Sequence, residues 1–248
     1  MQRWVTSLLI AMLLAVPSVA SNESAGEFVL SQKVTLNKDL NGVDGWLQVM
    51  IDARLSEKVR KEMWGVGGWA FVMPEDDPQY KMFSATPPQN AELQIVDSQG
   101  HVLASEILER PLAEIKQARL QVDRPTFLVT VDYSIGMGSY AGLTTLVLDV
   151  ANAKLRWLEA VNGRTGKSSP IRLPKTLKSD WMLKSRGAQK DILQVLCRPD
   201  DFGGSGAFSV AYIRYHFDEG AGWKMRERVK KGIWESDEPF PEAPQFRQ

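Results

Sequence analysis

The sequence contains a single cysteine, Cys197, among 248 residues. One cysteine cannot form an internal disulfide bond, so the hydrophobic core must stabilise the fold. Cys197 shares one face of an expected strand with Leu193 and Val195, and free cysteine is among the most often buried residue types. We therefore predict a buried thiol at Cys197. A nucleophile and an intermolecular disulfide are the alternatives.

Histidine is almost as scarce, since the chain contains only His101 and His216. Two histidines 115 residues apart and one cysteine supply no zinc-ligand spacing. The acidic clusters Glu75–Asp77, Asp200–Asp201 and Asp218–Glu219 lack the alternating ligand order of a calcium-binding loop. We therefore expect no metal site and no cofactor.

The chain also lacks a long hydrophobic run. Its most apolar stretch, Trp4–Val16, has 13 residues, whereas a membrane-spanning helix needs about 20. Arg3 precedes this stretch and Pro17–Ala20 follows it, which is the order of a secretory signal peptide. We predict a cleaved signal at residues 1–20 and export to the bacterial periplasm. Because no cysteine stands at the cleavage point, we expect a soluble protein rather than a lipoprotein.

Neither sign of charge is in excess, because 30 lysines and arginines balance 30 aspartates and glutamates. Removing residues 1–20 leaves 228 residues and takes away one cation, Arg3, so the mature net charge is about −1. This balance gives no electrostatic reason to expect nucleic acid or an anionic membrane as a partner. We expect a single β-rich globular domain over residues 21–232, with a possible subdivision near residue 120.

Strand patterns dominate the remaining sequence. Residues 46–54 alternate apolar and polar side chains, and residues 91–108 have the pattern of a hairpin with a polar turn. Helical patterns are few and short. One helix is expected after the capping residue Ser56, and a second is expected to begin at Pro111.

The C-terminal half contains two similar patterns. Residues 127–159 and residues 192–228 each have a strand, a glycine-rich loop, a second strand, a tight turn and a third strand. Each unit is typical of a three-stranded meander, which indicates either a two-copy repeat or the ordinary spacing of an antiparallel sheet. We predict a mainly β fold, an antiparallel sandwich or open barrel built from meanders, with one or two short helices.

Two glycine motifs resemble known functional sites but lack the required context. Gly136–Ala141 matches the G-x-G-x-x-A form of a dinucleotide-binding turn, and Gly203–Ala207 approaches the G-x-S-x-G turn of hydrolases. Both motifs require a helix to follow. The residues after each motif instead have the pattern of a strand, so hairpin loops explain the glycines better.

Paired carboxylates have no local sequence signature, so glycoside hydrolysis stays open as an alternative. Asp132 is the first acid to consider, because we expect it on the non-core face of a strand that runs into the glycine-rich loop. Asp200 is the second. A hydrolase of this kind requires a cleft lined by at least two acids that include one of these residues.

The most distinctive feature is a stretch of aromatic and methionine residues interrupted by glycines and prolines at positions 63–83. Large side chains on loops are common at binding sites, but they also fill the end of a β-sandwich. Residues 233–248 form an extended, proline-rich tail whose aromatics either dock on the domain or contact a partner. We select as candidate partner-binding residues Trp64, Trp69, Phe71, Tyr80, Trp234 and Phe240.

These observations favour a non-enzymatic periplasmic binding or interaction protein, such as an envelope accessory factor, an inhibitor or an immunity protein. Its expected partner is another periplasmic protein. The alternative is an exported hydrolase that acts on cell-wall or glycan substrates through paired carboxylates. A purely structural role in an envelope complex fits the same observations.

Overall fold

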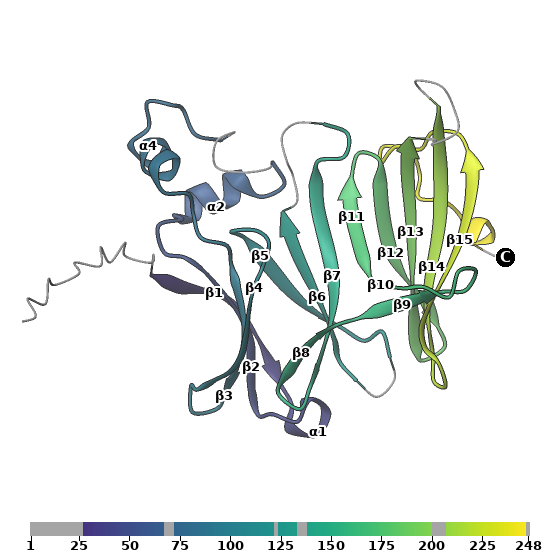
Figure 1. The fold of residues 1–248 in the computed structure, drawn as a ribbon, viewed down its shortest axis with the longest axis horizontal. Coiled ribbons are helices and arrows are strands. Elements are labelled where there is room, and N and C mark those ends of the chain that lie inside the picture. Colours follow the sequence, from purple (N-terminus) through teal and green to yellow (C-terminus); the bar gives the residue numbers. More distant parts are fainter. Residues whose placement is uncertain (1–26, 67–71, 122–123, 133–137, 200–206, 247–248) are drawn as a thin grey trace, which may run out of the picture.

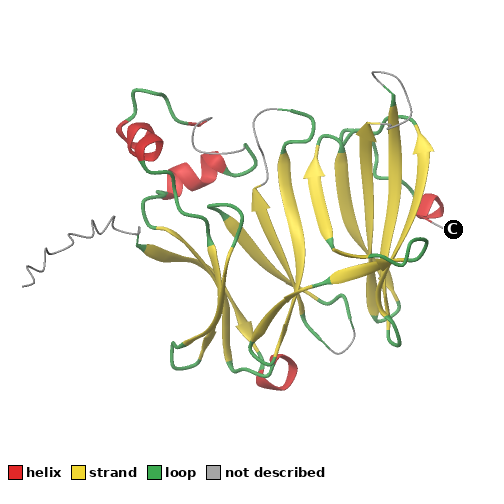
Figure 2. Cartoon of the chain, viewed as in Figure 1, coloured by secondary structure: helices red, strands yellow, loops and turns green. Residues whose placement is uncertain are grey.

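The computed structural model describes residues 27–66, 72–121, 124–132, 138–199 and 207–246. The described residues form two β-sheets with a few short helices, as Figures 1 and 2 show. The mainly β fold predicted from the sequence is therefore confirmed. Among the described residues, no helix is both long and apolar enough to cross a membrane.

The first sheet is an antiparallel meander in the order β1–β2–β3–β4. Its strands are β1 (Phe28–Leu36), β2 (Gly45–Asp52), β3 (Glu92–Asp97) and β4 (Val102–Ile107). The alternating pattern at residues 46–54 corresponds to β2, where Leu47, Val49 and Ile51 are fully buried. The hairpin predicted within residues 91–108 is the β3–β4 pair. Both predictions are confirmed.

The second sheet has eleven strands within the described residues and ends at β10 and β5, so it does not close into a barrel. Its hydrogen-bonded order is β10–β9–β15–β14–β13–β12–β11–β7–β6–β5, and β8 pairs with β7 beside this path. The strands are β5 (Ala113–Ala118), β6 (Thr126–Asp132), β7 (Gly142–Ala151), β8 (Lys154–Trp157), β9 (Glu159–Asn162), β10 (Ser168–Pro170), β11 (Arg172–Thr176), β12 (Ser179–Arg186), β13 (Gln189–Pro199), β14 (Phe208–Asp218) and β15 (Gly222–Lys231).

The two predicted meanders are present as β6–β7–β8 and β13–β14–β15. Asn152 and Ala153 form the β7–β8 turn with φ values of +52° and +55°, as a two-residue type I′ turn requires. The chain then departs from a simple meander at Leu158, whose backbone N–H donates to the carbonyl of Val147 at 2.7 Å. Beyond this point β9 leaves β7 and pairs in parallel with β15.

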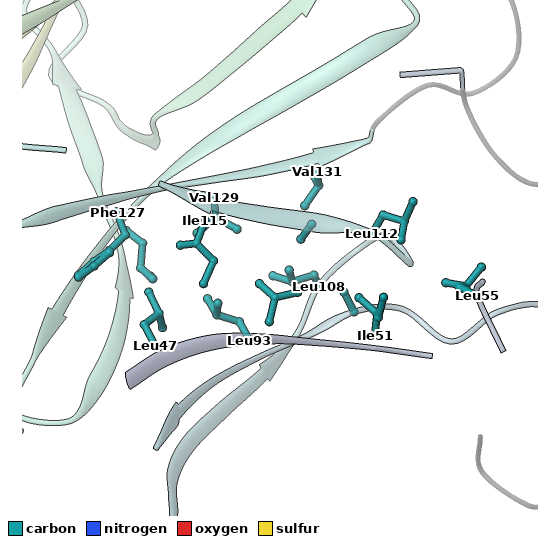
Figure 3. Close-up of a cluster of buried hydrophobic side chains, with 14 of the residues drawn as sticks. Leu47, Ile51, Leu55, Leu93, Leu108, Leu112, Ile115, Phe127, Val129 and Val131 are labelled. Carbon is teal, nitrogen blue, oxygen red and sulfur yellow. The ribbon is translucent and has the colours of Figure 1, made fainter. Parts of the chain in front are cut away.

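The first hydrophobic core lies between the four-stranded sheet and one face of β5, β6 and β7. Figure 3 shows Leu47 and Leu93 from the first sheet opposite Ile115, Phe127 and Val129 from the second. Because alternate residues of a strand point to opposite faces, these residues form one side of a sandwich. Burial of apolar side chains here stabilises the packing of the two sheets.

A second core lies on the opposite face of the eleven-stranded sheet. It joins Leu128 of β6 to Leu173 of β11, Ile213 of β14 and Trp223 of β15. Strands that are far apart in the sheet order can share one cluster only if the sheet curls around it. We call this side of the sheet the concave face.

The described helices are short and lie at loops. Ser56 caps α2 (Glu57–Met63) by accepting a hydrogen bond from the backbone N–H of Val59 at 3.3 Å, which confirms the helix predicted there. Helix α4 (Pro78–Ala85) was not predicted, and α1 (Lys38–Asn41) is a single turn.

The helix predicted to begin at Pro111 is wrong, because the structure has strand β5 there. Ala113 and Ile115 are buried, whereas Glu114 and Lys116 are exposed, so the burial alternates with a period of two. Pairing with β6 along the full length of β5 fixes this conformation. Tertiary pairing therefore overrides the weak local helical signal.

The C-terminal tail packs on the outer face of β13 and β14. Trp234 and Phe246 are buried there, and Phe240 stacks on Phe246 with ring centroids 5.8 Å apart. This tail covers Cys197, which is fully buried as predicted. An ion pair between Lys178 and Glu235 joins the tail to the β11–β12 turn.

Candidate functional site

The structure assigns the predicted partner-binding residues to separate regions. Trp64 and Tyr80 are half-buried and pack against the first core, near α2 and α4. Trp234 and Phe240 belong to a separate cluster formed by the tail with β13 and β14, and Figure 1 shows these strands at the end of the molecule away from α2 and α4. They do not form one surface together with Trp64 and Tyr80. Trp69 and Phe71 lie outside the described residues, and a partner-binding role for any of the six stays a prediction.

Asp132, the acid considered first for catalysis, is buried with 8% exposure. Its carboxylate accepts a hydrogen bond from the backbone N–H of Gly65 at 2.9 Å. This contact joins the end of β6 to the residues that follow α2. Asp200 lies outside the described residues.

The glycine motifs are followed by strands rather than helices, as expected. Strand β7 begins at Gly142 and β14 begins at Phe208. A Cβ atom at Gly142 would lie 2.3 Å from the carbonyl oxygen of Lys175 in the neighbouring strand β11. The close approach of two strands therefore requires glycine at position 142, which lies just after the motif.

One candidate site is a cavity of about 840 Å³ beside the segment that joins β8 to β9, and we call it the Arg–Trp basin. Its lining residues come from four places: the described residues between β5 and β6, the segment that joins β8 to β9, the start of β13, and the β14–β15 hairpin. Its lining residues are Gln121, Arg124, Arg156, Trp157, Leu158, Glu159, Gln189, Phe217, Glu219, Gly222 and Trp223. This volume is within the usual range for binding sites of small organic molecules, roughly 300–1,000 Å³.

Two arginines of the basin share one buried acid. The side chain of Asp149 on β7 is 8% exposed, and it forms ion pairs with Arg156 and, at 3.8 Å, with Arg124. Asp149 and Arg156 are direct cross-strand partners in β7 and β8. The arginine side chains are 54% and 61% exposed, so N–H donors remain available toward the basin.

Aromatic side chains form the apolar part of the basin. Trp223 is 4% exposed, and its ring lies 5.8 Å from that of its cross-strand partner Phe217. The indole N–H of Trp157 donates to Glu106 at 2.6 Å. The indole nitrogen of Trp223 is shielded from solvent and has no hydrogen-bond acceptor among the described residues.

Other polar residues of the basin keep part of their hydrogen-bonding capacity. Glu159 accepts a hydrogen bond from the Ser168 hydroxyl at 2.7 Å. Gln189 accepts one from Arg186 at 2.8 Å. Two carboxylates, two amides and two guanidinium groups thus surround the cavity together with three aromatic rings. Among the described residues, no group of three histidine, cysteine or acidic side chains is arranged to hold a metal ion.

Sequence reasoning did not identify the basin, because its residues lie between positions 121 and 223 and form no local motif. In comparisons with known proteins, no family model, no curated protein and no solved structure matched this chain.

Proposed function

We propose that the protein is a non-enzymatic binding protein of the bacterial periplasm and that its ligand occupies the Arg–Trp basin. The observation that carries this proposal is the lining of the basin, in which three aromatic rings and six planar polar groups surround about 840 Å³. Apolar surface with a few convergent polar groups is characteristic of small-molecule sites. The export signal predicted at residues 1–20 supports the periplasmic location.

The lining favours a sugar as the ligand. A sugar ring has apolar C–H faces and a rim of hydroxyl groups that both donate and accept hydrogen bonds. Aromatic rings such as Trp157 and Phe217 can pack on the C–H faces. Arg124, Gln121 and Glu219 offer planar groups that can bond two neighbouring hydroxyls at once.

Isothermal titration of the mature protein with a trisaccharide of N-acetylglucosamine tests this proposal. We expect saturable binding by the wild type and binding about tenfold weaker for Arg124→Gln, because one charged donor is lost. Arg124 lies at the longer distance from Asp149, so Arg156 still neutralises that acid in this variant. Arg164→Gln, on the exposed turn after β9, is the matched control and should bind as the wild type does.

Absence of heat with the wild type, or equal weakening in both variants, would contradict a sugar ligand in the basin. The folded state of each variant is checked by its thermal unfolding midpoint. A ligand that binds elsewhere would leave Arg124→Gln unchanged.

The second candidate function is a glycan hydrolase, because Glu159 and Glu219 both line the basin. Two carboxyl groups about 5–10 Å apart are the catalytic requirement for glycoside hydrolysis. Mass spectrometry of the same trisaccharide mixtures tests this function. If the wild type produces shorter sugars and neither Glu159→Gln nor Glu219→Gln does, catalysis replaces the binding proposal. A trisaccharide that stays intact with the wild type favours binding.

A further inference from the structure

A second cavity of about 520 Å³ lies on the concave face, and we call it the cationic cleft. Its first wall is formed by β5 and β6, and its second wall by the hairpin of β12 and β13. The two walls meet where the backbone N–H of Lys190 donates to the carbonyl of Leu120 at 3.2 Å. Its lining residues are Lys116, Gln117, Ala118, Arg119, Leu128, Trp181, Leu183, Ser185, Gly187, Ala188, Gln189 and Lys190.

The floor of the cleft is apolar. Leu128 belongs to the second core, and Trp181 and Leu183 are half-buried side chains that pack against the same core. The register of β12 and β13 places Trp181 and Leu183 opposite Gln194 and Ile192, on the concave face. A hydrocarbon chain placed here would cover apolar surface that is now partly exposed to water.

The indole nitrogen of Trp181 adds a polar feature to this floor. It is shielded from solvent and has no hydrogen-bond acceptor within the described part of the chain. A buried donor without an acceptor is unfavourable. If a bound ligand displaced the atoms that shield this nitrogen, an oxygen atom of the ligand could accept its hydrogen bond.

The rim of the cleft is positively charged. Lys116 and Arg119 are exposed, and Lys190 is half-buried. None of these three side chains has an ion pair or hydrogen bond to another described residue. Among the described residues, no acid lines the cleft, and the nearest acid along β5, Glu114, lines a different cavity.

The arrangement differs from that of the Arg–Trp basin, where Asp149 already neutralises part of the arginine charge. Three cations around one cavity, with no acidic partner among the described residues, raise the local concentration of anions. Their positive charge lies above the apolar floor, so a molecule with both an anionic group and an apolar chain matches the cleft in both respects.

We propose that the cationic cleft binds an anionic amphiphile, a molecule with one carboxylate or phosphate head and a hydrocarbon chain. The head contacts Lys116, Arg119 and Lys190, and the chain covers Leu128, Trp181 and Leu183. This site is independent of the sugar proposed for the basin, because the two cavities share only Gln189.

Titration calorimetry with four probes tests the proposal: decanoate, decyl phosphate, 1-decanol and acetate. We expect decanoate and decyl phosphate to bind at least about tenfold more tightly than decanol, which lacks the charge, and than acetate, which lacks the chain. The decanoate and decyl phosphate arms distinguish a carboxylate head from a phosphate head. Loss of the difference between decanoate and decanol would overturn the role of the cations.

Matched variants locate the binding site. The double variant Lys116→Gln/Lys190→Gln should bind decanoate about tenfold more weakly, while the control Lys154→Gln/Lys167→Gln removes two cations elsewhere and should bind normally. Trp181→Phe keeps an aromatic ring but removes the indole donor and should abolish most of the fluorescence change caused by decanoate. Equal weakening in both double variants would indicate nonspecific attraction and reject the cleft.

Arg124→Gln separates this proposal from the function proposed for the basin. We expect it to weaken the trisaccharide and to leave decanoate unaffected. If it weakened decanoate instead, the amphiphile would occupy the basin and the cleft proposal would be wrong. Thermal midpoints of all variants show whether a loss of binding reflects unfolding.

Discussion

The two meanders β6–β7–β8 and β13–β14–β15 have the same order of elements, but their aligned residues lie on opposite faces of one sheet. Without gaps, Leu128 of the first unit aligns with Leu193 of the second, and Leu148 aligns with Ile213. Leu128 belongs to the concave core, whereas Leu193 lies on the outer face of its strand. Conversely, Leu148 packs in the first core and Ile213 in the concave core.

This inversion shows what an alternating pattern determines. Alternation identifies which residues share a face, because side chains repeat every two residues. It does not identify what covers that face. A four-stranded sheet covers the outer face of the first meander, and the C-terminal tail, which contains the short 3-10 helix Ala243–Phe246, covers part of the outer face of the second.

The largest expected change in the free energy of unfolding is in the first core, where the four-stranded sheet covers the first meander. Phe127→Ala removes a fully buried ring from the first core and should lower the free energy of unfolding by about 3–5 kcal/mol. Urea unfolding followed by circular dichroism and by tryptophan fluorescence measures this change. If the two sides form one cooperative unit, both probes shift together. Separate transitions would show that the chain divides into two units, as considered near residue 120.

A smaller change in the free energy of unfolding is expected where the tail covers β13 and β14. Trp234→Ala should lower the free energy of unfolding by about 2–3 kcal/mol, because its ring is buried but lies on a segment that can adjust. It should also expose the Cys197 thiol, which a thiol-specific reagent detects as a faster reaction. Trp64→Ala is the control, since Trp64 lies at the other end of the molecule. A thiol that stays unreactive in Trp234→Ala would show that the tail is not its shield.

The smallest expected effect concerns Asp52, an ionised residue in the four-stranded sheet that covers the first meander. Burial would raise the pKa of Asp52, but hydrogen bonds from Arg54 and from the backbone N–H of Gln89 outweigh it and hold the pKa below its usual value. The Arg54–Asp52 contact measures 2.5 Å.

A carboxylate with a lowered folded pKa adds stability at pH values above its unfolded pKa of about 3.9, and that stability is lost as the pH falls through the folded pKa. We expect about 1–2 kcal/mol of the acid sensitivity to come from Asp52. Urea unfolding of the wild type and Asp52→Asn at pH 7 and pH 3 measures this contribution. If both proteins lost equal stability between these pH values, Asp52 would not be its source.

Local features of the sequence were sufficient to predict much of the fold. Ser56 is followed by residues that form a helix, and the alternation in residues 46–54 corresponds to β2. Cys197 is buried as the apolar face around it indicated. These signals depend on neighbours within a few positions, and here they agree with the tertiary structure, whereas the local helical signal after Pro111 does not, because β5 pairs with β6.

The cavities could not be predicted in this way. Lys116 and Lys190 face the same space only because the sheet curls and joins Leu120 to Lys190. Large aromatics on loops are common in binding sites, and for this reason the sequence favours a partner-binding role for Trp64, Tyr80, Trp234 and Phe240. In the structure they pack against the domain, since burying such side chains is itself favourable.

The tail also affects when, during folding, the Cys197 thiol becomes buried. Cys197 lies in β13, and its hydrophobic cluster contains Val210 of β14 together with Trp234 and Phe240 of the tail, which is the last of these segments in the chain. The cluster around the Cys197 thiol is therefore complete only after the tail has docked on β13 and β14. In an oxidising compartment, where thiols can form mixed disulfides, the speed of this last docking step sets how many molecules escape modification.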